Sequence, residues 1–149
     1  MRQLPQLWRG VFRILVGVFW LYFASTKWGG VGWMRPLIQS AYTYNPIPGL
    51  HEILQVVVAP NWYLFAVAQT LGETVVAVLL ILGLATRKAA VLGLLLALNL
   101  ALVVAFEVGD PGFRWLYYLA VLVNAELIFN DPGWPSLGSY KFVPAWLRS

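Results

Sequence analysis

The hydrophobic residues of the chain are concentrated in four long runs separated by more polar segments. A run of about 20 apolar residues is enough for a helix to cross the hydrocarbon core of a bilayer. Each run reaches or approaches that length, so the pattern predicts an all-α, four-helix membrane bundle in a single domain over residues 1–149. The predicted spans are residues 7–25, 62–84, 88–107 and 113–130.

Composition indicates an integral membrane protein. Hydrophobic residues make up 60% of the chain and charged residues 11%, against about 45–50% and about 25% in ordinary soluble domains. We therefore expect the lipid bilayer to be the main partner of the chain. The net charge of +4 is explained by membrane topology and contact with anionic lipid, and no nucleic-acid-binding pattern accompanies it.

The basic residues predict an orientation. Seven of the ten Lys and Arg residues lie near the start of the first run, between the second and third runs, or after the fourth. Because cytoplasmic segments collect Lys and Arg, we expect a multi-pass protein of the plasma (cytoplasmic) membrane with both termini cytoplasmic. Residues 131–149 are then a cytoplasmic tail. Lys27, Arg35 and Arg114 fall on the opposite side, where residues 26–61 form a long outer loop.

Part of the outer loop is predicted to be helical. Residues 45–60, NPIPGLHEILQVVVAP, have a Pro- and Gly-rich entry followed by an apolar run that ends before Pro60. This run is too short to span a bilayer. We expect a short helix that lies in the membrane interface or re-enters over the outer mouth of the bundle.

Polar residues inside the predicted spans are the main candidates for function. Glu73 lies at the midpoint of the second span, and Gln69, one turn earlier, shares its face. An ionised carboxylate at this depth costs at least ~2.5 kcal/mol, so Glu73 must be protonated, paired or directed into a polar interior. In one interpretation a neutral Glu73 hydrogen-bonds to Gln69, Asn99 or a backbone carbonyl and holds helices together. In the other, Glu73 is a proton acceptor in an interior site, with Gln69, Asn99 and Asn124 as ligand-binding residues.

Residue types that are missing or rare limit the cofactors. The chain contains no cysteine, and its single histidine is His51. We therefore expect no disulfide, haem, iron-sulfur or zinc site from this chain. His51 remains a candidate ligand-binding residue in the outer loop. A redox cofactor would have to come from a partner or from the lipid phase.

Two segments resemble the DoxX-like and DoxD-like membrane proteins. FRILVGVFWLYFASTKW, residues 12–28, resembles the beginning of these proteins, and GETVVAVLLILGLATRKAAVLGLLLAL, residues 72–98, is similar to their Gly-Glu and Thr-Arg segment. With the NPIP loop, the resemblance extends over about residues 12–130. The residues that match the family pattern are Arg13, Lys27, Glu73, Thr86 and Arg87.

The resemblance implies a redox role. DoxD-like proteins form the membrane subunit of thiosulfate:quinone oxidoreductase, so the chain is expected to help pass electrons from a small sulfur compound such as thiosulfate to membrane quinone, together with a soluble or membrane partner subunit. In this hypothesis Lys27, Arg35 and Arg114 attract the anion, and Glu73 faces a cavity that holds the quinone headgroup. A non-catalytic membrane anchor or scaffold for a partner protein, and a small transporter, are the alternatives.

Overall fold

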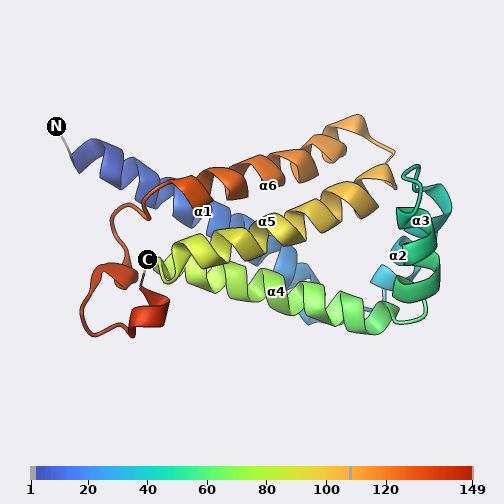
Figure 1. The fold of residues 1–149 in the computed structure, drawn as a ribbon, viewed down its shortest axis with the longest axis horizontal. Helices are drawn as coiled ribbons and strands as arrows, with labels where there is room; N and C mark the ends of the chain where they lie inside the picture. The colour runs from blue at the N-terminus through green and yellow to red at the C-terminus, as the bar shows by residue number, and fades with distance from the viewer. Residues whose placement is uncertain (1–2, 108, 149) are drawn as a thin grey trace.

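A computed structural model of the chain describes residues 3–107 and 109–148. Its four long helices are α1 (Gln3–Trp28), α4 (Trp62–Leu82), α5 (Thr86–Val103, extended by the 3-10 turn η2, Val104–Phe106) and α6 (Pro111–Phe129). All four are long and apolar enough to cross a membrane. The prediction of an all-α, four-helix integral membrane bundle is confirmed. In Figure 1 α4, α5 and α6 run side by side, with α1 packed along α4.

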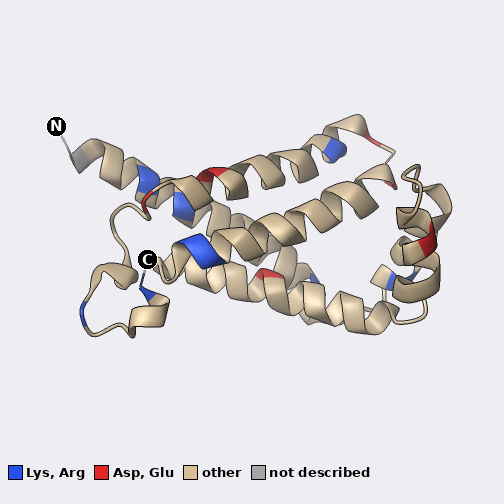
Figure 2. Cartoon of the chain, viewed as in Figure 1, with Lys and Arg blue, Asp and Glu red and all other residues tan. Residues whose placement is uncertain are grey.

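The bundle has two different ends (Figure 1). The start of α1 and the C-terminal segment lie at one end, here called the terminal end. The α2 and α3 segments lie at the other, here called the α2 end. Figure 2 shows that charged residues gather near the ends of the helices, whereas α4 carries an acidic residue in its middle.

The helix boundaries follow from local chemistry. At the start of α6, Asp110 Oδ1 accepts a hydrogen bond from the backbone N–H of Gly112 (2.7 Å), and Pro111 occupies the first helical position. Proline fits there because that position has no intrahelical N–H bond to lose. At the end of α4, Gly83 adopts φ +68°, and the N–H of Leu84 donates back to Leu79. A residue without a Cβ favours this left-handed ending.

The outer loop contains more helix than predicted. The expected short helix is present as α3 (Leu50–Ile53) and a π-helical turn η1 (Leu54–Val58), but α2 (Met34–Tyr44) precedes it. Pro36 does not prevent this helix, because it lies in the first turn of α2, where proline is tolerated. Met34 and Ala41 are buried on the inner face of α2.

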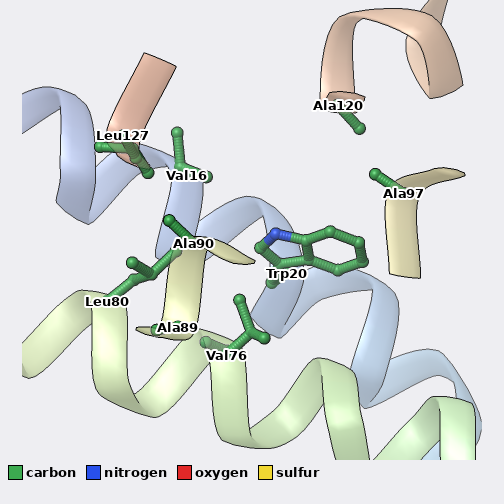
Figure 3. Packing of buried hydrophobic residues seen from close by; sticks show 10 residues of the cluster. Val16, Trp20, Val76, Leu80, Ala89, Ala90, Ala97, Ala120 and Leu127 are labelled. Atoms are coloured by element: carbon green, nitrogen blue, oxygen red, sulfur yellow. The ribbon is translucent and has the colours of Figure 1, made fainter. Parts of the chain in front are cut away.

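Small side chains allow the helices to approach one another. Trp20 of α1 is fully buried and packs with Val76 and Leu80 of α4 and with Ala90 of α5 (Figure 3). Close approach through Ala and Gly is the usual way for helices to pack where lipid supplies no hydrophobic contrast. Ala120 and Leu127 of α6 belong to the same cluster, so the core joins all four long helices.

The predicted cytoplasmic tail is folded rather than extended. Residues 130–148, here called the terminal cap, include the 3-10 turns η3 (Leu137–Ser139) and η4 (Ala145–Leu147) and lie across the terminal end of the bundle (Figure 1). Backbone hydrogen bonds attach the cap to α1 and to the α4–α5 turn. They run from Trp134 N–H to Gln6 O (2.9 Å), from Gly138 N–H to Gly83 O (3.0 Å) and from Ala85 N–H to Leu147 O (2.7 Å).

Candidate functional site

The polar residues inside the bundle form a connected network. Lys27 Nζ donates to Oε2 of Glu73 (2.6 Å), and Gln69 Nε2 donates to Oε1 of the same carboxylate (2.9 Å). Asn99 Nδ2 of α5 donates to Oε1 of Gln69 (3.2 Å). The four side chains, here called the polar network, therefore connect α1, α4 and α5.

The position of Lys27 corrects the sequence prediction. We expected Lys27 in the outer loop, but α1 continues past the predicted end at residue 25 and includes Lys27 in its last turn. Its side chain is 6% exposed and pairs with the fully buried Glu73. Lys27 therefore reaches the middle of α4, because α1 is displaced along α4 toward the terminal end. Its burial makes it unsuitable as the surface cation that would attract an anion.

The ion pair with Lys27 explains how the Glu73 carboxylate is accommodated in the middle of a membrane-spanning helix. The expected hydrogen bond from Gln69 to Glu73 is present. The second partner of Glu73 is Lys27, which the sequence analysis had placed in the outer loop. Lys27 Nζ also donates to the backbone oxygen of Phe23 (3.1 Å). A buried pair of this kind needs such additional hydrogen bonds to offset the loss of hydration.

The carboxylate fixes the direction of the hydrogen bonds that lead away from it. An ionised carboxylate only accepts, so Gln69 must turn its Nε2 to Glu73 and its Oε1 to Asn99. Asn99 consequently turns Nδ2 to Gln69. An amide nitrogen carries two hydrogens, so the second hydrogen of Asn99 Nδ2 remains for another acceptor.

An apolar cleft begins where this network ends. It has a volume of about 290 Å³ and lies between α2, η1, α4 and α5. Gln69 and Asn99 are the polar side chains of its wall. Phe65 and Leu95, both exposed, stand at its rim, so the cleft, here called the lateral cleft, opens toward the side of the bundle that faces lipid.

Asn124 belongs to a separate structural contact. Its Oδ1 accepts a hydrogen bond from Nε1 of Trp20 (3.2 Å), and its Nδ2 donates to the backbone oxygen of Ala120 (2.7 Å). A Cβ on Gly93 would come within 2.2 Å of Asn124 Oδ1. The side chain is fully buried, away from the walls of the lateral cleft.

The other predicted binding residues lie on different elements. Arg35 of α2 places its guanidinium 5.8 Å from the ring centroid of Trp62, within the range of a cation–π contact. His51 lies in α3, and Arg114 in the first turn of α6. Among the described residues, none of these three lines the lateral cleft. The structure thus brings together Lys27, Gln69, Glu73 and Asn99, but not Arg35, His51, Arg114 or Asn124.

Arg13 is a buried cation whose environment the sequence did not reveal. It is fully buried in α1, and Nη2 donates to the backbone oxygen of Pro135 in the terminal cap. Nη1 occupies space that a side chain at Gly83 would fill. This places the guanidinium at the C-terminal end of α4, where the helix dipole favours a positive charge. Arg13 therefore holds α1, α4 and the terminal cap together.

These features define a class of protein: a multi-pass integral membrane bundle with a buried ion pair beside a lipid-facing cleft. The family model DoxX matches residues 10–106, more than half of the chain. The protein belongs to the DoxX family. The match includes the whole polar network and the lateral cleft, whereas α6 and the terminal cap lie outside it. Comparisons with curated proteins and with solved structures give no significant match.

Proposed function

We propose that the protein is the quinone-binding membrane subunit of a redox complex that passes electrons from a small sulfur compound such as thiosulfate to membrane quinone. The observation that carries this proposal is the exposed amide of Asn99 on the wall of an apolar cleft, backed by a buried ion pair. A polar amide left facing hydrocarbon is costly. A ligand that offers a hydrogen-bond acceptor would remove that cost.

The lateral cleft suits a quinone headgroup. Its volume of about 290 Å³ is close to the lower limit of ~300 Å³ for small-molecule pockets, which are mostly apolar with a few directed polar groups. Phe65 and Leu95 at the rim face the region where the isoprenoid chain of a quinone resides. The ligand could therefore enter from the bilayer without crossing water.

The residues of the polar network have distinct roles in this proposal. Asn99 Nδ2 donates to a quinone carbonyl, and Gln69 holds Asn99 in the required orientation. A bound quinone would accept two electrons and two protons. Glu73 is the proposed proton-accepting group: its Oε2 lies 2.6 Å from Lys27 Nζ, so the carboxylate can take up a proton and pass it on, through Gln69 and Asn99, to the quinone as it is reduced.

The sulfur chemistry is assigned to a partner subunit. The chain has no cysteine and thus no thiol to react with a sulfur donor. In the proposed orientation, with the termini in the cytoplasm of a plasma-membrane protein, the α2 end carries Arg35 and Arg114 on the outer side. Their positive charge would attract an anionic donor or an acidic partner surface to this side.

Quinone binding tests the proposal directly. The full chain would be purified into quinone-depleted lipid nanodiscs and titrated with a short-chain ubiquinone analogue. Asn99→Leu removes the amide donor at the cleft, and we expect binding about fivefold weaker, the loss of one hydrogen bond of about 1 kcal/mol. Thr74→Val is the matched control, since it removes a polar group of α4 outside the cleft walls.

Two results would reject the proposal. Either the wild-type protein binds no quinone, or Asn99→Leu and Thr74→Val bind as well as the wild type. The first result would favour a membrane anchor whose chemistry belongs entirely to a partner, and the second would show that Asn99 does not hold the quinone.

A further inference from the structure

A second cavity lies at the terminal end of the bundle. It has a volume of about 560 Å³ and lies between the start of α5 and the first and last residues of the terminal cap. Three basic side chains line it, Arg87, Lys88 and Arg148. This cavity is here called the basic cavity.

The fold holds two of the three cations in place. Arg148 Nε donates to the backbone oxygen of Val143 (2.9 Å), and its Nη2 donates to that of Lys141 (2.8 Å). Lys88 Nζ donates to the backbone oxygen of Trp146 (3.0 Å). The terminal cap therefore brings Arg148 next to the first turn of α5, although the two are far apart in sequence.

The charge of the basic cavity favours an anion. Its acidic wall residue is Asp131, which already pairs with Arg9 across 3.4 Å. The remaining charge comes from Arg87, Lys88 and Arg148. Cations grouped in this way bind phosphate groups, and Arg can do so through two parallel hydrogen bonds.

The surroundings indicate that the phosphate belongs to a lipid. Val91, on the cavity wall, is 43% exposed, and Leu95, one turn further along α5, is 58% exposed. They form an apolar track that leads from the cavity along a membrane-spanning helix. Trp134, Phe142 and Trp146 of the terminal cap are also exposed, and aromatic residues favour the headgroup region of a bilayer.

We propose that the basic cavity binds the phosphate headgroup of an anionic glycerophospholipid, whose acyl chains lie along Val91 and Leu95. Basic pockets between helices at the cytoplasmic side of membrane proteins bind anionic headgroups. The bound lipid would join α5 to the terminal cap. This site does not depend on the quinone proposal.

The test uses the purified full chain, stripped of lipid in a neutral detergent. Native mass spectrometry would measure retention of phosphatidylglycerol and, separately, of phosphatidylcholine. We expect the wild type to prefer phosphatidylglycerol, and Arg87→Gln to lower that affinity about fivefold, as expected for removal of one basic contact. Lys141→Gln is the matched control, because Lys141 is a basic residue of the same cap outside the cavity lining.

A second variant separates binding from folding of the cap. Arg148→Gln also removes two hydrogen bonds to the cap backbone, so trypsin cleavage after Lys141 would be measured beside lipid retention. For Arg87→Gln we expect weaker lipid retention but a rate of trypsin cleavage equal to that of the wild type. Equal retention of the two lipids, or equal losses in Arg87→Gln and Lys141→Gln, would overturn the proposal. Displacement of phosphatidylglycerol by millimolar inorganic phosphate would overturn the lipid assignment in favour of free phosphate.

Discussion

Lys27 and Glu73 form a buried ion pair between the last turn of α1 and the middle of α4, with 2.6 Å between Nζ and Oε2. Neither charge has access to water, so each residue supplies the counter-charge without which burial of the other would be costly. The attraction within a buried pair is largely offset by lost hydration. The pair therefore specifies how α1 and α4 align more than it adds to net stability.

Removing one partner of this pair is expected to be far more damaging than removing both. Glu73→Gln leaves the Lys27 ammonium buried without a counter-charge, which costs about 3–5 kcal/mol. Lys27→Met combined with Glu73→Leu removes both charges and should recover most of that loss. The free energy of unfolding of both variants would be measured in detergent mixtures of increasing denaturing strength. Equal destabilisation in the single and double variants would contradict this account of the pair.

Filling the lateral cleft should weaken quinone binding without unfolding the protein. Ala68 is exposed and lines the cleft, so Ala68→Phe places a ring where the headgroup is proposed to bind. Crowding of this kind costs about 1–3 kcal/mol, equivalent to at least about fivefold weaker binding. The control is Val75→Phe, at an exposed position of α4 outside the cleft. Equal binding by the two variants would place the quinone elsewhere.

The turn between α4 and α5 offers two substitutions with different expected effects. Gly83 has φ +68°, and an added Cβ would meet the Arg13 guanidinium. Gly83→Ala should therefore lower the free energy of unfolding by at least about 1–3 kcal/mol. Ala85 already carries a side chain at φ 42°, so relief of strain in Ala85→Gly should offset the flexibility gained and keep the change within about 1 kcal/mol. Thermal unfolding compares the two, and a larger loss in Ala85→Gly would refute the argument.

Docking of the terminal cap should depend on Gly10. A Cβ at this position would lie 2.1 Å from the backbone oxygen of Trp134, so Gly10→Val must displace the cap. Loss of even one backbone hydrogen bond shifts opening by about 1 kcal/mol, which predicts trypsin cleavage after Lys141 at least about fivefold faster. Val11→Leu, at the exposed neighbouring position, is the control. Unchanged cleavage in Gly10→Val would show that the cap is held without this contact.

The sequence predicted the parts of the fold that depend on local composition. Four apolar runs were sufficient for the four long helices, because each run must satisfy its own backbone hydrogen bonds in lipid. The contact between Gln69 and Glu73 also followed from their spacing of one helical turn. Asn99, which was expected as a possible partner of Glu73, instead bonds to Gln69 and reaches the carboxylate through it.

The partner of Glu73 could not be predicted in the same way. Lys27 follows a polar Ser-Thr pair, and two glycines come directly after Trp28, which resembles the beginning of a loop. Its inclusion in α1 depends on the carboxylate that it meets 46 positions later. The fold of the terminal cap likewise depends on distant groups, such as Arg13 and Gly83, and these contacts leave no periodic pattern in the sequence.

The terminal cap also has a consequence for biogenesis. Its residues are synthesised after all four membrane helices, yet they bond to Gln6 in the first helix and to the turn at Gly83 and Ala85. The helices must therefore enter the bilayer and assemble first. Only then can the terminal cap fold against their ends. Closure of the cap at the membrane surface thus marks a bundle in which α1 and the α4–α5 turn are already in place.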